Sequence, residues 1–324
     1  MTPTVLVTGG QGTMGPWVVR ALHERGARAV VLDQLDRPRS ALGDAAAVPD
    51  EAIVGDIRDT DLVRAALRDH GITHVVHLAA IVGEACERDP VTALEVNTIA
   101  TARLIEAAEA AGVARLVSNS TKGTLGPLPE RYLHPTYEPV PIDHPPSPRQ
   151  IYEVSKLGVE RLVAAARSRG LSATTLRFTT TWGPGKSAAT HAGLSFHSDL
   201  VTQAMTGGEV AVDVHPDQGF DLVYYADVGA AIAAAALVDG PLQSHVYHVG
   251  AGRLTRMREF AAALEAAFPR CHVTMGERFP PGRNVLFDIE PARRDLGYEP
   301  AFDVPTSLAD IAARAAAPAS SPAT

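Results

Sequence analysis

The chain has 324 residues, of which 46% are hydrophobic and 20% charged, a globular composition at a length that fits one large unit or two smaller ones. Its 37 acidic and 29 basic side chains give a formal charge of −8, which argues against a nucleic-acid-binding surface. Two cysteines cannot build a disulfide framework, and no apolar run reaches the roughly 18–20 residues that span a bilayer. We therefore expect a cytoplasmic protein with neither a nucleic-acid nor a membrane partner.

From the N-terminus, short β-branched runs alternate with longer amphipathic stretches. The predicted strands are Thr4–Val7, Ala29–Leu32, Ala52–Val54, His74–Leu78, Arg115–Val117 and Ala173–Phe178. The predicted helices are Met14–Arg25, Asp61–His70, Thr92–Ala111 and Ile151–Ser168. Such alternation is typical of βαβ units with right-handed crossovers. It predicts an α/β fold with a Rossmann-like, doubly wound parallel sheet.

The pattern changes after the fifth strand, where Gly126–Pro148 contains eight prolines and predicts a long loop. The later predicted elements are strands at Leu222–Tyr225 and Val246–Val249 and helices at Val228–Leu237, Met257–Phe268 and Leu308–Ala315. We predict that residues 1–182, with 220–250 returning to them, form a dinucleotide-binding domain. Residues 183–219 and 251–315 are predicted to form a smaller C-terminal substrate lobe, and 316–324 a flexible tail.

A glycine-rich loop connects the first predicted strand to the first predicted helix. In Gly9-Gly10-Gln11-Gly12-Thr13-Met14-Gly15, Gly9 allows a tight turn, Gly12 lets the backbone approach a diphosphate, and Gly15 allows close packing of helix on sheet. The start of the helix then offers free N–H groups to that diphosphate. We expect a dinucleotide here, bound by Gly9, Gly12, Thr13, Met14 and Gly15.

The second predicted strand ends at Asp33, eighteen residues after Gly15. A carboxylate in this place can accept hydrogen bonds from both ribose hydroxyls and repels a 2′-phosphate. The sequence therefore favours NAD over NADP, although Arg37 and Arg39 leave NADP open.

Four motifs, in this order and spacing, resemble those of the extended short-chain dehydrogenase/reductase family. They are Gly9-x-x-Gly12-x-x-Gly15, Gly55-Asp56-Ile57-Arg58, His77-Leu78-Ala79-Ala80 and Tyr152-x-x-x-Lys156. The similarity runs from about Thr4 to Pro300 and is greatest to the nucleotide-sugar epimerase and dehydratase branch. It implies that Asp56, Ile57, Leu78, Ala79 and Ala80 lie against the cofactor. It also implies that Asn97, the family's buried helix asparagine, lies beside it with a mainly structural role.

The Tyr152–Lys156 pair lies four residues apart on a predicted helix and therefore on one face. A lysine ammonium beside a phenol favours the phenolate, so we expect it to lower the tyrosine pKa from about 10. Tyr152 can then exchange a proton with a substrate hydroxyl as acid or base. The resemblance implies that Lys156 also holds the nicotinamide ribose. It further implies a hydroxyl at the end of the fifth strand that polarises the substrate oxygen, either Thr121 or Ser120.

The substrate is less clearly indicated. Lys122-Gly123 stand where related dehydratases carry an acidic pair, so dehydration is disfavoured. Where epimerases carry an asparagine after the sixth strand, the sequence reads Arg177-Phe178-Thr179-Thr180-Thr181, and Phe220 stands where many carry an arginine that binds a diphosphate. Arg278 or Arg283 could replace that arginine. The tentative substrate residues are Thr180, His191, Ser195 and Arg283.

The sequence thus predicts an NAD-dependent oxidoreductase acting on a secondary alcohol or ketone of a sugar, sugar acid or similar polyol. The alternative is a nucleotide-sugar epimerase with tightly bound NAD and no net redox, and a third possibility is a catalytically silent NAD-sensing protein. No metal site is predicted, because the histidine pairs His74/His77 and His245/His248 point to opposite faces of their strands. The resemblance implies a homodimer packed through the Tyr152 helix and Thr92–Ala111.

Overall fold

In a computed structural model that describes residues 2–36, 47–184, 196–280 and 284–316, seven parallel strands form the central sheet. Their order is β11-β6-β5-β4-β1-β2-β3. The bounds are β1 Thr4–Thr8, β2 Arg28–Asp33, β3 Glu51–Val54, β4 His74–His77, β5 Arg115–Thr121, β6 Ala173–Phe178 and β11 Val246–Val249. The chain winds outward from β1 in both directions, so the predicted Rossmann-like, doubly wound sheet is confirmed.

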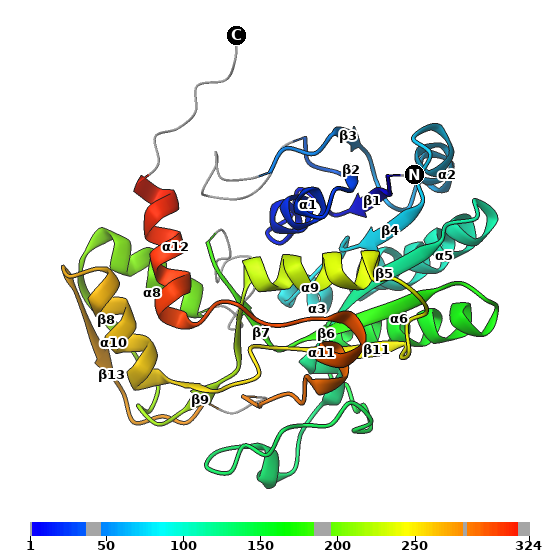
Figure 1. The fold of residues 1–324 in the computed structure, drawn as a ribbon. Coiled ribbons are helices and arrows are strands. Elements are labelled where there is room, and N and C mark those ends of the chain that lie inside the picture. Colours follow the sequence, from blue (N-terminus) through cyan, green and yellow to red (C-terminus); the bar gives the residue numbers. More distant parts are fainter. Residues whose placement is uncertain (1, 37–46, 185–195, 281–283, 317–324) are drawn as a thin grey trace.

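Helices cover both faces of the sheet (Figure 1). One face carries α1 Gly15–Glu24 and α9 Tyr225–Leu237, and the other carries α2 Thr60–Asp69, α5 Ala100–Ala110 and α6 Ile151–Ser168. Alternate side chains of β1 divide between the two cores: Val5 and Val7 pack under α1 and α9, whereas Leu6 packs against the helices opposite. This two-sided burial explains why the strands read as continuous apolar runs.

The helix predicted over Thr92–Ala111 is divided into three segments. They are α4 Pro90–Leu94, a π-helical turn η2 Glu95–Ile99, and α5. Just after the wide turn, the Thr101 hydroxyl of α5 donates to the Asn97 carbonyl within it at 2.6 Å. Such π turns often occur beside functional sites, and this one carries a buried polar side chain, that of Asn97, toward the loop after β4.

A smaller group of elements lies beside the sheet, at the left of Figure 1. It contains α8 Phe196–Thr206, β8 Gly208–Val212, α10 Met257–Ala267, β13 Cys271–Met275 and α12 Val304–Ala316, with β8 and β13 paired in parallel. Short strands connect the two regions: β7 Thr180–Trp182 pairs with β10 Leu222–Tyr224, and β9 Gly219–Phe220 pairs with β12 Thr255–Arg256. Two 3-10 turns, η3 Lys122–Leu125 and η4 Glu130–Tyr132, and two short helices, α3 Glu84–Arg88 and α11 Glu290–Leu296, complete the described elements.

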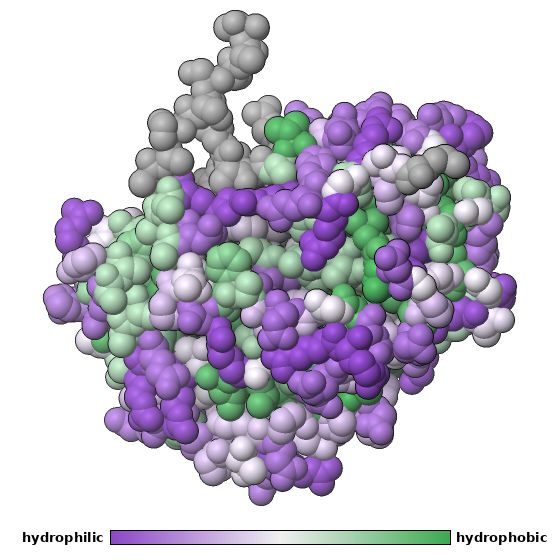
Figure 2. Space-filling view, in the orientation of Figure 1, coloured by the Kyte–Doolittle hydropathy of each residue, from purple (hydrophilic) through white to green (hydrophobic). Residues whose placement is uncertain are grey.

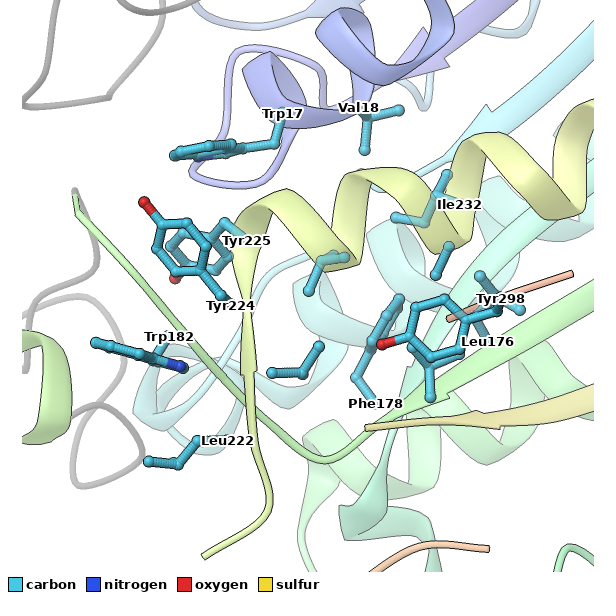
Figure 3. Close-up of a cluster of buried hydrophobic side chains, with 14 of the residues drawn as sticks. Trp17, Val18, Leu176, Phe178, Trp182, Leu222, Tyr224, Tyr225, Ile232 and Tyr298 are labelled. Carbon is cyan, nitrogen blue, oxygen red and sulfur yellow. The ribbon is translucent and has the colours of Figure 1, made fainter. Parts of the chain in front are cut away.

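The strand predicted at Leu222–Tyr225 is β10, which pairs with β7 and not with a strand of the main sheet. An aromatic cluster holds it in place (Figure 3). The Tyr224 ring lies 5.3 Å from that of Trp17 and 5.6 Å from that of Trp182. The two elements that follow β10 do reach the main sheet. The helix α9 packs on it, and β11 pairs with β6 at its edge.

No helix among the described residues is long and apolar enough to cross a membrane. On the face drawn in Figure 2, hydrophilic side chains cover most of the surface and hydrophobic ones form smaller separate areas.

Candidate active site

The glycine loop forms a tight backbone cradle after β1. Gly9 has a φ of +71°, and a Cβ atom there would lie 2.5 Å from the Ala79 backbone nitrogen. A Cβ on Gly15 would lie 1.9 Å from the Gly10 carbonyl oxygen. No larger residue fits either place without moving backbone, so Gly9 lets the loop lie against the backbone after β4, and Gly15 lets α1 start close to the glycine loop. At the start of this ten-residue helix the Gly15 N–H donates to the Gly12 carbonyl at 3.2 Å and Pro16 has no N–H, so fewer donors are free than the sequence predicts.

The Asp33 carboxylate is oriented by the backbone around it. One oxygen accepts from the Gln11 N–H at 2.9 Å and the other from the Leu35 N–H at 3.1 Å. Each carboxylate oxygen keeps a second lone pair, so Asp33 can still accept from the two hydroxyls of a ribose. This geometry fits the predicted dinucleotide.

A cavity of about 1080 Å³ runs from the glycine loop past the ends of β2, β4, β5 and β6. Its size is that of a pocket for a large ligand. Most of the predicted site residues line it: Gly9, Gly12, Thr13, Met14, Gly15, Asp33, Ile57, Leu78, Ala79, Ala80, Ser120, Thr121, Tyr152 and Thr180. The cradle and the oriented Asp33 carboxylate fit a dinucleotide at one end of the cavity, and Tyr152 and Thr121 stand on the wall of the same cavity.

Three of the predicted cofactor-binding residues, Asp56, Asn97 and Lys156, form hydrogen bonds with other groups of the protein. Asp56 bonds to Arg58 at 2.6 Å and to Gln34 at 2.8 Å, which holds the pKa of its carboxyl below the usual value. Asn97 exchanges two hydrogen bonds with the Ile81 backbone, at 2.8 and 2.9 Å, and thereby fixes a loop that lines the cavity. The buried Lys156 donates from Nζ to Asn119 Oδ1 at 3.0 Å. Asn119 itself lines the cavity and was not predicted; its only sequence signal is its place at the end of β5.

Burial dominates the acid–base properties of the Tyr152–Lys156 pair. The Lys156 ammonium lies 5.9 Å from the centre of the Tyr152 ring. Burial lowers the pKa of Lys156 to about 8 and raises the pKa of Tyr152 above its ordinary value. The expectation that Lys156 lowers the tyrosine pKa is therefore wrong, because burial of the phenol, which disfavours the charged phenolate, dominates.

The two candidate hydroxyls at the end of β5 have different surroundings. The Ser120 hydroxyl donates its proton to Glu160 Oε1 at 2.6 Å, inside a buried network in which Arg177 makes two bonds to the same carboxylate, at 3.0 and 2.7 Å. Thr121 Oγ1 accepts from the Gly123 N–H at 3.1 Å. Its own proton is therefore available to a ligand, and this distinguishes it from Ser120.

The far end of the cavity combines aromatic and cationic groups. Lys122 donates from Nζ to Thr180 Oγ1 at 2.7 Å, and both residues line the cavity. Phe220 is buried there with its ring 4.6 Å from that of His197. The predicted substrate residues His191, Ser195 and Arg283 lie outside the described residues.

Comparison with known proteins agrees with this geometry. The family model described as the NAD dependent epimerase/dehydratase family matches residues 5–250. A UDP-glucose 4-epimerase of Streptomyces lividans is 29% identical, over 96% of this chain and 94% of its own. The UDP-glucose 4-epimerase of Thermotoga maritima, solved with UDP-glucose, is 25% identical, with a TM-score of 0.79 over 96% of this chain and 98% of its own. That of Thermus thermophilus, solved with NAD, is 27% identical, with a TM-score of 0.76 over 96% and 99%.

Proposed function

Because the chain belongs to the NAD-dependent epimerase/dehydratase family, an extended short-chain dehydrogenase/reductase family whose cofactor is NAD, we propose that it oxidises a secondary alcohol of a sugar, sugar acid or similar polyol. The observation that carries the proposal is the single cavity of about 1080 Å³. It joins the glycine cradle and Asp33 at one end to Tyr152 and Thr121 along the same wall.

The residues of the cradle hold the cofactor in this proposal. The glycine loop faces the diphosphate, and Asp33 accepts from the ribose hydroxyls. Lys156, positioned by Asn119, holds the second ribose. Bound there, NAD supplies the acceptor or donor of a hydride at the substrate carbon.

Tyr152 and Thr121 act on the substrate oxygen. Thr121 donates its hydroxyl proton in a hydrogen bond that holds this oxygen against the wall. Tyr152 takes the hydroxyl proton during oxidation and returns it during reduction. Because burial disfavours the phenolate, this proton transfer depends on a positive charge near the phenol, and the Lys156 ammonium is the fixed charge on α6 that can supply it.

A panel of neutral sugars, sugar acids and polyols, each mixed with the protein and NAD, tests the proposal. We expect NADH to accumulate with at least one member, and NADP to be a poorer cofactor. If no member of the panel yields NADH and a UDP-sugar is converted to its epimer, the second candidate would replace this proposal.

That second candidate is epimerisation of a nucleotide sugar without net redox. The specific observation in its favour is the full-length similarity to UDP-glucose 4-epimerases. Two positions argue against it. Phe220 stands where many related epimerases carry an arginine that binds the diphosphate, and the segment that includes Thr180 stands where they carry an asparagine. Incubation with UDP-glucose distinguishes the two, since the second candidate predicts its epimer without NADH.

Replacing Asp33 by asparagine is expected to weaken NAD binding about tenfold and to narrow the preference for NAD over NADP. The carboxylate loses its charge and one of its two acceptor oxygens, and a 2′-phosphate is no longer repelled. Calorimetric titration with both nucleotides measures the two affinities. Asp61→Asn, on the exposed side of α2, is the matched control. Unchanged affinities in Asp33→Asn would remove Asp33 from the ribose site.

NAD affinity is expected to fall as the pH rises through about 8. The pKa of Lys156 is lowered to about 8, so below this pH the side chain is charged and can hold a ribose, and above it the charge is lost. Titration of NAD from about pH 6.5 to about pH 9.5 measures the effect. In Lys156→Met the same dependence should be absent; if it persists, another group titrates.

We also propose that the protein is a homodimer packed through α4, η2 and α6. Four apolar side chains are exposed on these elements: Val91 (68%), Leu94 (36%), Ile99 (49%) and Val154 (44%). Burying such groups between two copies is favourable. Sedimentation should give twice 34.1 kDa for the protein and a shift toward monomer for Ile99→Glu combined with Val154→Glu. A monomeric parent protein would contradict the proposal.

A further inference from the structure

The helix that carries Tyr152 is held at its first residue by a side chain from another element. The Ile151 N–H, directly before Tyr152, donates to Glu87 Oε1 at 2.7 Å, although Glu87 lies 64 positions earlier, in α3. The two preceding N–H groups donate to Glu153 of α6 itself, at 2.8 and 3.2 Å. The helix therefore caps its own start, and Glu87 adds a contact that fixes where this start lies relative to α3.

The short helix α3 belongs to the wall of the cavity. Residues 83–85, at its start, line the cavity beside the loop that follows β4. The buried Cys86 thiol donates to the Ile81 carbonyl at 3.2 Å, which ties α3 to that loop. A ligand that fills the cavity therefore lies against the same short helix from which Glu87 reaches the start of α6.

A second, buried contact holds the same turn of α6. The Ser155 hydroxyl donates to the Tyr152 carbonyl at 2.7 Å and accepts from Asn97 Nδ2 at 3.0 Å. Ser155 and Asn97 are each 1% exposed, so replacing either would leave a buried polar group without this partner. Glu87 is exposed, and water can reach the Ile151 N–H if the carboxylate is removed. The Glu87 contact can therefore be tested without destroying the fold.

We propose that Glu87 is a positioning residue for Tyr152 and that it couples the cavity-lining helix α3 to the turn that carries the phenol. The inference rests on the function proposed above, in which Tyr152 exchanges a proton with the substrate oxygen. Such a transfer needs the two heavy atoms within about 2.6–3.2 Å of each other. A displacement of about 1 Å can lower a rate by about 100-fold. Glu87 holds the backbone directly before Tyr152, so its effect on the reaction passes through Tyr152.

The test measures the single-turnover rate of NADH formation with the best sugar of the panel or, if the protein is an epimerase, the rate at which UDP-glucose is converted. The variants are Glu87→Ala, which removes the acceptor, and Glu87→Gln, which keeps an acceptor oxygen. Glu106→Ala, at an exposed position of α5, is the matched control. We expect Glu87→Ala to lower the rate about tenfold, with KM for substrate and NAD changed by less than about twofold. Glu87→Gln should keep more than about half of the rate, and Glu106→Ala should leave it unchanged.

A double variant separates positioning from a purely structural role. In a Tyr152→Phe background, Glu87→Ala should cause no further loss, because the phenol through which Glu87 acts is absent. The same loss in both backgrounds, a parental rate in Glu87→Ala, or a change confined to KM would overturn the proposal. If the parent protein turns over neither sugars nor UDP-glucose, the proposed function fails, and amide hydrogen exchange of residues 149–156 then tests the coupling. Exchange at least about tenfold faster in Glu87→Ala than in Glu87→Gln supports the coupling of α3 to the Tyr152 turn, and equal exchange overturns it.

Discussion

Replacing Tyr152 by phenylalanine is expected to lower kcat by about 10²–10⁴-fold while NAD binding changes little. The Tyr152 phenol lines the same cavity as the Thr121 hydroxyl and is the group proposed above to exchange a proton with the substrate oxygen. A positioned general acid or base contributes rate enhancement of this order. The aromatic ring stays in place in the variant, so the shape of the wall is kept.

Steady-state kinetics with the best substrate of the sugar panel, together with an NAD titration, measures both quantities. Tyr132→Phe is the matched control, because that buried tyrosine belongs to η4 and bonds to Arg131, at 2.9 Å. If Tyr152→Phe kept more than about a tenth of the parental kcat, the proton transfer would have to be assigned to another group.

The second large effect concerns the buried ion pair behind the active site. Glu160 and Arg177 are 4% and 3% exposed and form two hydrogen bonds, and Arg177 also contacts His248 Nε2 at 3.0 Å. Replacing Arg177 by methionine leaves the Glu160 carboxylate buried without its cation. The free energy of unfolding is expected to fall by about 3–5 kcal/mol.

Urea unfolding of Arg177→Met measures this loss, and the double variant Glu160→Gln with Arg177→Met is its control, since it removes the uncompensated charge. We expect the double variant to recover a large part of the lost stability. If Arg177→Met does not fold, Glu160→Gln alone, which keeps an acceptor for Ser120, provides the comparison. A loss below about 1 kcal/mol in Arg177→Met would show that water or another cation reaches Glu160.

The sequence alone predicts the sheet and the cofactor well, because each depends on local patterns. Apolar runs and turn residues place β6, α6 and β11 at the residues expected. The residues of the glycine loop alone predict a tight backbone turn, because the steric limits at Gly9 and Gly15 follow from glycine having no side chain. The family, the enzyme class and the use of NAD are confirmed by the comparisons.

What the sequence does not reveal depends on side chains that meet from distant segments. Ser120, Glu160 and Arg177 belong to three different elements, so nothing in their spacing indicates that Ser120 donates its proton to a buried carboxylate. The contact between Lys122 and Thr180 spans 58 positions and is equally invisible. The balance of burial and charge at Tyr152 depends on the packed environment, which explains why its pKa moves opposite to the expectation.

The most direct test of the account is the nicotinamide nucleotide content of the purified protein. The protein is denatured, the released nucleotide is quantified, and a second sample is titrated with NAD and with NADP. We expect one NAD per chain, either carried through purification or bound on titration, with NADP bound more weakly because of Asp33. Retained NAD would favour epimerisation, and exchangeable NAD would favour the dehydrogenase. A protein that neither carries nor binds either nucleotide would contradict the central claim.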